Sequence, residues 1–355
     1  MPPARTTPPA PAPAGASPAS GLLEGGSRAP AALARPSGTF AMVAMDQRDS
    51  LRTMMAARLP GTDGRGEAGA AVPDSALTEF KLAVARSLGP AASALLIDRD
   101  YGYRALMDEA VLPGTCAPIL AVDTLDQRPG GPVEDTGLDE RADPAAAAAE
   151  GTRGLKLLVV WRRDAHRERR VELAARFVEL CRAAGLASVL EPVARPTREE
   201  ESANTFRLND AIVEAARELA PLRPSLYKCQ VPDGGTGTVA GTAAQAERID
   251  RAVEVPWVVL SQGVEPSAFP RAVEAACRAG ASGFLAGRAL WTDALDAHDR
   301  DARLGGPCLE RLRRLGETVD AYGRPWWDAP AAGAGAGPSP EGRDAADAAG
   351  EEGAA

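Results

Sequence analysis

The stretch LKLLVVWRRDAHRERRVELAARFVELCRAAGLASVLE, residues 155–191, contains a complete strand–helix–strand unit. Its first and last segments, 155–160 and 187–191, are short apolar runs of the kind that form buried parallel strands. Between them, apolar residues recur at helical spacing from Glu168 to Ala184, and Gly185 stands where a helix C-cap belongs. The unit therefore predicts a parallel sheet covered by helices.

Apolar runs of the same kind occur on both sides of this unit. Amphipathic segments that follow them, such as 206–220 and 269–279, are predicted to be crossover helices. Eight strands are the number that closes a barrel, so we predict an α/β fold, a single (β/α)₈ TIM barrel. The predicted strands are 40–45, 94–98, 117–122, 155–160, 187–191, 224–229, 256–261 and 282–286.

The two ends of the chain have a different composition. Residues 1–28 are dominated by Pro, Ala, Gly and Ser, and residues 329–355 are rich in Ala, Gly and acidic side chains. Because such segments bury little apolar surface, we expect both to be disordered extensions of a barrel that spans 29–328. The Gly- and Pro-rich segment 128–138 is expected to be a surface loop, with a mobile lid as the alternative.

The overall composition is that of a soluble protein with a large core. Hydrophobic residues make up 45% and charged residues 25%, and the formal net charge is −9. This charge and the lack of a long basic run argue against nucleic acid or an anionic membrane as a partner. No apolar run is long enough to span a bilayer, so we expect a cytoplasmic protein.

Cysteine and histidine are poorly placed for a metal site or a disulfide framework. The five cysteines are widely spaced, without a C-x-x-C pair, and are interpreted as small buried hydrophobes. The two histidines, His166 and His298, fall away from the predicted strand ends and are expected on the surface. We therefore expect no metal and no cofactor.

Polar residues gather at the carboxyl ends of the predicted strands, the face on which (β/α)₈ barrels assemble active sites. Phosphate sites of such barrels typically use the loops after the seventh and eighth strands. In chain order the residues at these ends are Asp46, Gln47, Arg48, Glu191, Lys228, Ser261, Gly263, Gly287 and Arg288.

Two lysines, Lys156 and Lys228, fall inside strands that are otherwise apolar, where an ammonium group is costly unless it is paired or loses its proton. A buried lysine beside a second cation can present a free amine, which attacks a ketone to form a Schiff base. Glu191 on the neighbouring strand is suited to pair with these lysines and to move protons between intermediates. The alternative is an ordinary buried ion pair between Glu191 and one lysine.

Two glycine-containing turns predict an anion site. SQGV at 261–264 and AGRA at 286–289 have small residues through which backbone N–H groups can reach a ligand, and Arg288 adds a charged fork of donors. Tight turns without a ligand are the alternative for both segments. The polar triplet Asp46-Gln47-Arg48 follows the first strand and indicates a ligand at the barrel mouth, with a solvated loop as its alternative.

These segments resemble the class I aldolases of the tagatose-1,6-bisphosphate aldolase group. The resemblance rests on DQR (46–48), LK (155–156), EP (191–192), LYK (226–228), the SxG turn (261–263) and AGRA (286–289), and it covers roughly residues 36–322. Within the group, FAMVAMDQRDSLRTMM, WVVLSQGV and AGASGFLAGRALW are similar to the branch that acts on 6-deoxy-6-sulfofructose 1-phosphate.

The resemblance implies roles for the residues at the strand ends. Lys228 would be the Schiff-base lysine, with Asp46, Gln47, Lys156 and Glu191 around the ketose hydroxyls and the imine. Arg288, Ser261, Gly263 and Gly287 would hold a terminal anion, and Arg48 would add a second anion contact. The reaction implied is metal-free cleavage of sulfofructose 1-phosphate into dihydroxyacetone phosphate and 3-sulfolactaldehyde.

Departures from that branch leave the identity of the ketose open. Gln262 stands where a second serine is expected, and Cys229-Gln230 stands where Val-Glu is usual. Tagatose 1,6-bisphosphate or fructose bisphosphate is the alternative substrate, and a non-catalytic barrel that binds a sugar phosphate is the alternative outside enzymes. The sequence also leaves open whether the chain forms a homo-oligomer.

Overall fold

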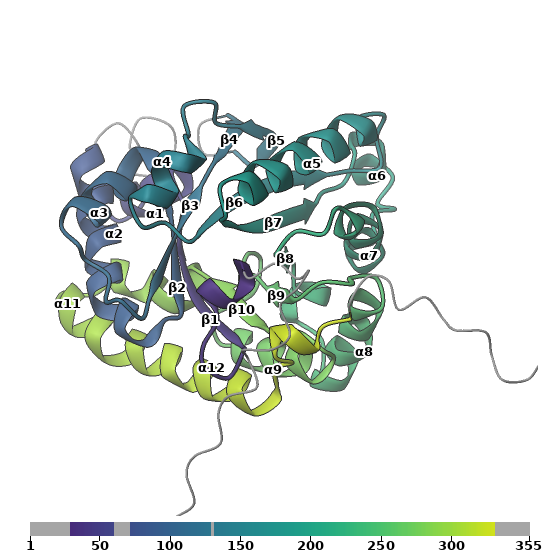
Figure 1. The fold of residues 1–355 in the computed structure, drawn as a ribbon. Helices are drawn as coiled ribbons and strands as arrows, with labels where there is room; N and C mark the ends of the chain where they lie inside the picture. The colour runs from purple at the N-terminus through teal and green to yellow at the C-terminus, as the bar shows by residue number, and fades with distance from the viewer. Residues whose placement is uncertain (1–28, 60–71, 129–130, 331–355) are drawn as a thin grey trace, which may run out of the picture.

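A computed structural model describes residues 29–59, 72–128 and 131–330 and confirms the predicted (β/α)₈ barrel (Figure 1). Eight parallel strands close in the order β1-β10-β9-β8-β7-β6-β3-β2. Each contains residues of one predicted strand, with ends that differ by up to three residues. Their bounds are β1 Phe40–Met45, β2 Ala94–Asp98, β3 Ala117–Ala121, β6 Gly154–Trp161, β7 Ala187–Ala194, β8 Leu226–Cys229, β9 Trp257–Val259 and β10 Gly283–Ala286.

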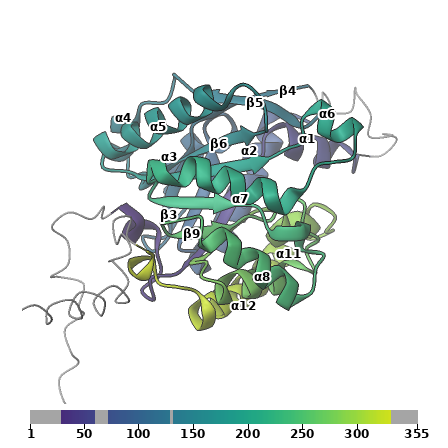
Figure 2. The ribbon, with the colours of Figure 1, turned by 90° about the vertical axis from the view of Figure 1, so that its right-hand side faces the viewer.

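Helices surround the barrel (Figures 1 and 2). The helix predicted from Glu168 to Ala184 is α5, and it ends before Gly185, whose positive φ makes it a left-handed C-terminal residue. The helices are α1 Asp49–Ala56, α2 Asp74–Leu88, α3 Arg104–Asp108, α4 Pro144–Ala149, α5 Arg167–Ala183, α6 Arg198–Ser202, α7 Leu208–Leu219, α8 Val239–Asp250, α9 Phe269–Arg278, α10 Arg288–Trp291, α11 Arg300–Arg303 and α12 Leu309–Tyr322.

The interior of the barrel is filled by alternate residues of the strands. Side chains in a strand alternate between two faces, so residues 40, 42 and 44 of β1 share one face, as do 187 and 189 of β7. These residues belong to one buried cluster that also includes Leu226, Val258 and Leu285. Leu33, from the 3₁₀ helix η2 (Ala29–Leu33), is fully buried in the same cluster and helps to seal its amino-terminal end.

The closure between β1 and β10 depends on a residue without a side chain. Gly283 has φ +141°, and a Cβ built on it would lie 2.0 Å from the carbonyl oxygen of Phe40. Phe40 and Gly283 are register partners in the parallel pair. The two backbones can therefore approach this closely only because position 283 is glycine.

The prediction that residues 128–138 form a surface loop was wrong for 133–138. These residues form β5 (Val133–Leu138), which pairs antiparallel with β4 (Asp123–Gln127) in a two-stranded sheet outside the barrel. The Thr136 side chain is buried and accepts a hydrogen bond from the backbone N–H of Val160 in β6. Of the described residues, Gly131 and Pro132 precede β5, whereas Gly137 lies within it and pairs with Thr124 of β4.

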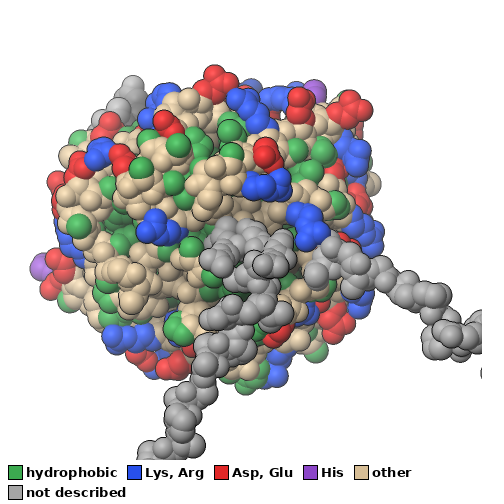
Figure 3. Space-filling view, in the orientation of Figure 1, with side chains coloured by type: hydrophobic (Ala, Val, Ile, Leu, Met, Phe, Trp, Pro, Cys, Tyr) green, Lys and Arg blue, Asp and Glu red, His purple; other side chains and the backbone are tan. Residues whose placement is uncertain are grey.

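The surface of the molecule carries charges of both signs. Arg, Asp and Glu side chains are interspersed over the face shown in Figure 3. His166 and His298 are exposed, as predicted, and all five cysteines are buried and free. Within the described ranges, no helix has the length and apolarity needed to cross a bilayer. The predicted disordered extensions, 1–28 and nearly all of 329–355, lie outside the described residues.

Candidate active site

The alternation that fills the barrel also places polar side chains at its mouth. Asp46 continues the face of residues 40, 42 and 44, Glu191 continues that of 187 and 189, and Lys228 follows Leu226. These side chains and Lys156 of β6 line a cavity of about 260 Å³ at the carboxyl ends of the strands. We refer to it as the inner cavity.

Lys156 lies at the centre of three carboxylates. Its Nζ is 2.7 Å from Asp46 Oδ2, 2.8 Å from Asp123 Oδ2 and 3.0 Å from Glu191 Oε2. Burial alone would lower the pKa of Lys156, but Asp123, Asp46 and Glu191 together raise it well above its usual value. The three carboxylates therefore favour the charged ammonium form of Lys156.

The same network keeps Asp46 ionised. Burial would raise the pKa of Asp46, but the charges of Lys156, Lys228 and Arg48 and the hydrogen bond from Lys156 lower it well below its usual range. At neutral pH the inner cavity therefore contains a fixed positive charge on Lys156 beside a fixed negative charge on Asp46.

Lys228 has a different environment from Lys156. Its Nζ lies 2.9 Å from Glu191 Oε2, and among the described residues this is its only carboxylate partner. The same Glu191 oxygen is the one that contacts Lys156, so one acidic oxygen lies between two amines. In an ordinary ion pair Glu191 would contact one lysine. Here it contacts both, and Lys228 has fewer carboxylate contacts than Lys156.

The predicted anion-binding residues come together only in part. Arg288, Ser261 and Gly287 line the inner cavity, whereas Gly263 is exposed and is not among the lining residues. The Gly287 N–H donates to Ser261 Oγ at 3.2 Å, which links the two turns. A Cβ at Gly287 would lie 2.8 Å from the carbonyl oxygen of Ala44 and from Gln47 Nε2, so the close approach of α10 to β1 requires glycine there.

Arg288 is a cation without a counter-ion in the described chain. Its guanidinium group forms no ion pair or hydrogen bond with any described residue, and burial lowers its pKa although the charge of Asp46 opposes this shift. An uncompensated, largely buried guanidinium group is costly unless a ligand neutralises it. Arg288 is therefore well suited to receive an anionic group.

Gln47 and Arg48 line the same cavity. Gln47 Nε2 donates to Asp46 Oδ1 at 3.4 Å, and Gln47 Oε1 is buried without a partner among the described residues. Arg48 is neutralised by Asp123, since its guanidinium donates to the Asp123 carbonyl oxygen at 2.9 Å and to Oδ1 at 3.1 Å. Arg48 thus differs from Arg288 in having a carboxylate partner.

Sequence reasoning missed Asp123, which organises one side of the site. It follows Val122 at the end of the third apolar run, so its place after a strand was a usable signal. Its carboxylate contacts Lys156 and Arg48 and accepts a hydrogen bond from the Leu158 N–H at 3.0 Å. Asp123 thereby ties β6 to the start of β4.

The lysine content of the chain is unusually low. The sequence has three lysines, Lys81, Lys156 and Lys228, and all three are buried. Lys81 of α2 is engaged by Asp98 at the end of β2 in an ion pair in which both side chains are fully buried. Of the three amines, two line the inner cavity and one is held by the α2–β2 contact.

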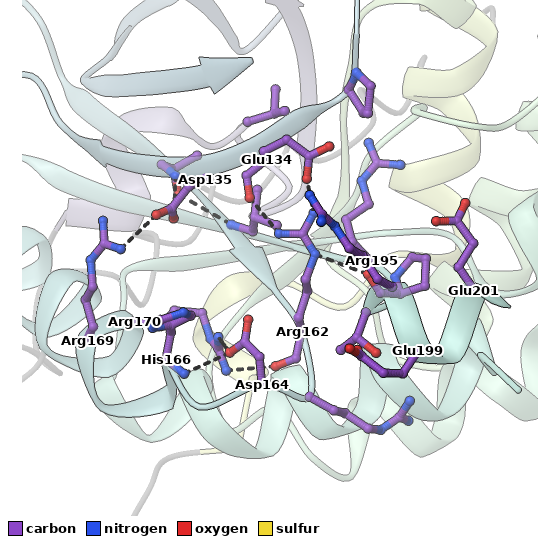
Figure 4. Close-up of a pocket in the computed structure, with 18 of the residues that line it drawn as sticks. Glu134, Asp135, Arg162, Asp164, His166, Arg169, Arg170, Arg195, Glu199 and Glu201 are labelled. Carbon is purple, nitrogen blue, oxygen red and sulfur yellow. Dashed lines mark hydrogen bonds and ion pairs between the residues drawn. The ribbon is translucent and has the colours of Figure 1, made fainter. Parts of the chain in front are cut away.

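A larger cavity of about 780 Å³ lies beside the inner one (Figure 4). We refer to it as the outer cavity. It is lined by the start of α5, by α6 and by the β5 hairpin, and it contains none of the three lysines. Three residues line both cavities: Pro132, Val133 and Arg195, which follows β7 and was also missed by sequence reasoning.

Comparisons with known proteins relate the chain to aldolases. A family model described as DeoC/LacD family aldolase matches residues 40–293. Tagatose 1,6-diphosphate aldolase of Listeria monocytogenes serotype 4a is 26% identical over 323 residues, which cover 83% of this chain and 91% of the relative. Tagatose 1,6-diphosphate aldolase 1 of Enterococcus faecalis is 27% identical over 273 residues, which cover 72% and 81%.

Solved structures of similar fold are also aldolases. Fructose-bisphosphate aldolase from Plasmodium falciparum matches with a TM-score of 0.57 and 17% identity, over 84% of this chain and 97% of that one. An archaeal fructose 1,6-bisphosphate aldolase matches with a TM-score of 0.54 and 16% identity, over 83% and 99%. At such identities the likeness concerns the fold.

Proposed function

The chain belongs to the DeoC/LacD family of aldolases and is therefore a carbon–carbon lyase, and from this premise we propose that it cleaves a phosphorylated ketose through a Schiff base on Lys228. One observation carries the proposal. Lys228 has a single carboxylate partner, whereas Lys156 is enclosed by three. Lys228 is thus the amine less engaged by carboxylates and is assigned the attack, and Lys156 supplies the fixed charge beside it.

The proposed reaction begins with attack of Lys228 Nζ on the ketone carbon C2. Glu191, 2.9 Å from that nitrogen, takes its proton and returns it to the carbinolamine hydroxyl, which leaves as water. The C3–C4 bond then breaks as the C4 hydroxyl gives its proton to a neighbouring carboxylate, and the bonding electrons pass to the iminium to form an enamine. Protonation at C3 and addition of water release the ketone product and free the lysine.

The proposed substrate is 6-deoxy-6-sulfofructose 1-phosphate, cleaved to dihydroxyacetone phosphate and 3-sulfolactaldehyde. The support is the similarity of WVVLSQGV (257–264) and AGASGFLAGRALW (279–291) to that branch, together with Arg288 as an unpaired cation for a terminal anion. The names of the curated relatives favour a second candidate, tagatose 1,6-bisphosphate. Both candidates use the same lysine.

Reductive trapping tests the Schiff base. Borohydride added with dihydroxyacetone phosphate is expected to attach a three-carbon adduct to Lys228, and Lys228→Met should abolish both adduct and turnover. Because the chain has only three lysines, peptide mass spectrometry can assign the adduct without ambiguity. An adduct on Lys156 or Lys81, or turnover by Lys228→Met, would refute the assignment.

A side-by-side assay tests the substrate. The purified protein should be supplied with 6-deoxy-6-sulfofructose 1-phosphate and with tagatose 1,6-bisphosphate at matched concentrations. A higher kcat/KM for the sulfonate is expected. The reverse order would assign the chain to tagatose 1,6-bisphosphate and would leave the lysine chemistry unchanged.

A further inference from the structure

Arg195 lines both the inner cavity and the outer one. It follows the last residue of β7. Two hydrogen bonds hold the backbone here: the Ala194 N–H donates to Gln230 Oε1 at 2.6 Å, and the Arg195 N–H donates to the Trp161 carbonyl oxygen at 2.9 Å. The base of the side chain is thus fixed by the barrel itself, while its guanidinium group lines both cavities.

The guanidinium group of Arg195 has no partner in the part of the chain that the structure describes. Its Nε is buried without a hydrogen bond, and no ion pair is formed by its terminal nitrogens. The nearby acid Glu134 is already occupied, since Arg162 donates to its Oε2 at 2.8 Å and to its carbonyl oxygen at 2.6 Å (Figure 4). Arg162 Nε also donates a hydrogen bond to the Pro196 carbonyl oxygen at 3.1 Å.

Neighbouring positive charges make it energetically costly for the Arg195 guanidinium group to lack a partner. Burial lowers the pKa of Arg195, and the positive charges of Arg162 and Arg288 lower it further, against the opposing charge of Glu134. Of the three arginines that line the inner cavity, Arg48 is neutralised by Asp123, whereas Arg195 and Arg288 are not. A cavity wall with two uncompensated guanidinium groups favours a ligand with two anionic groups.

The sizes of the cavities support a ligand that extends past Arg195. Sites for small molecules usually enclose about 300–1,000 Å³. The inner cavity, at about 260 Å³, is smaller than that range, while the outer one adds about 780 Å³ beyond Arg195. A six-carbon ketose with its reacting carbons beside Lys228 can therefore place its far end toward Arg195 and the outer cavity.

We propose that Arg195 binds the anionic group at the far end of the ketose, a sulfonate or a phosphate, while Arg288 binds the phosphate at the near end. This inference rests on the proposed function, because it takes Lys228 as the point of covalent attachment. Arg195 is a specificity-determining residue in this scheme. It distinguishes ketoses with two anionic ends from ketoses with one.

The test compares substrates that differ only in the far anion. kcat/KM is measured for 6-deoxy-6-sulfofructose 1-phosphate against 6-deoxyfructose 1-phosphate, and for tagatose 1,6-bisphosphate against tagatose 1-phosphate. In Arg195→Ala the two-anion ketoses should lose about ten- to a hundredfold, and the one-anion ketoses should change less than about threefold. Arg195→Lys, which keeps the charge without the fork, should fall between the wild type and Arg195→Ala.

Arg176→Ala is the matched control. Arg176 is exposed on α5, lines neither cavity, and should leave the discrimination between the paired ketoses unchanged. Equal losses on both members of a pair in Arg195→Ala, or no loss on either, would overturn the assignment. Arg195→Gln, which keeps most of the side-chain volume, gives the same comparison if the alanine variant does not fold.

Trapping with borohydride and dihydroxyacetone phosphate separates this inference from the proposed function. Dihydroxyacetone phosphate lacks the far anion, so the wild type and Arg195→Ala should form the adduct equally well. A wild type that forms no adduct would overturn the proposed function. An adduct in both proteins, with unchanged discrimination in Arg195→Ala, would overturn only the role of Arg195.

Discussion

Lys156 and Lys228 show how the surroundings of a residue set its role. Both are buried, on the two strands β6 and β8 that flank β7, and both contact the same oxygen of Glu191. Asp46 and Asp123 contact only Lys156 and raise its pKa together with Glu191. A group held so firmly in its charged form is a poor nucleophile, so the same side chain serves as a fixed charge at 156 and as the proposed nucleophile at 228.

Arg288 permits a prediction about binding. Replacing Arg288 with Ala should raise KM about ten- to a hundredfold and change kcat much less, because a group that holds the near phosphate contributes equally in the ground state and the transition state. Steady-state kinetics with the preferred ketose measure both constants. Arg311→Ala is the control, since Arg311 is paired with Asp293 and does not line the inner cavity. An unchanged KM in Arg288→Ala would contradict the anion role.

Sequence reasoning identified the residues that lie on the strands better than those beyond them. Lys156, Glu191 and Lys228 could be predicted because a charged residue in an apolar run is conspicuous. Asp123 directly follows the third apolar run and could have been proposed on that ground, whereas nothing in the sequence separates Arg195 from a solvated arginine. Their roles depend on which partners the fold supplies: two cations for Asp123 and none for Arg195.

The strands of the barrel could be predicted because each is largely buried on both faces and its residues are mainly apolar. β4 and β5 could not, since this hairpin is buried only in part and contains four acidic residues among eleven. Tertiary contacts stabilise it: the Val160 N–H donates to Thr136 Oγ1, and the Arg162 side chain donates to Glu134. Those contacts join residues that are more than twenty positions apart.

The β1–β10 junction permits a prediction about stability. Gly283→Ala should lower the free energy of unfolding by about 3 kcal/mol or more, because the new methyl group would collide with the backbone of Phe40 at a φ that alanine avoids. Urea denaturation measures the loss. Gly305→Ala, at a position with no atom near the new Cβ, should change it little. Equal stability of the two variants would show that β10 can move away from β1 at no cost.

At the scale of the whole molecule, the inner cavity should link stability to pH. The lowered pKa of Asp46 adds stability above its usual value of 3.8, and this is lost as pH falls through the folded value. The raised pKa of Lys156 adds stability below its usual value of 10.5, and this is lost as pH rises through the folded value. Both contributions are therefore fully present only between these limits.

Lys156→Met tests this linkage. At pH 8 it should cost about 3–5 kcal/mol, because three buried carboxylates lose their shared cation. At pH 5 the cost should be smaller, since carboxylates without a cation can take up protons. Urea denaturation at both pH values measures the difference, with the exposed Arg251→Met as control. The same cost at both pH values would contradict the linkage.

The burial of every lysine has a practical consequence for handling the protein. All three lysine side chains are buried, and the basic side chains on the surface are arginines. Reagents that acylate amines, and supports that couple proteins through amines, therefore find no lysine on the surface. A slow acylating probe small enough to enter the barrel mouth should therefore modify the chain at Lys228 before Lys156. If bound ketose protects Lys228 from the probe, the fraction of chains labelled only in the absence of ketose would measure how much of a preparation has a functional active site.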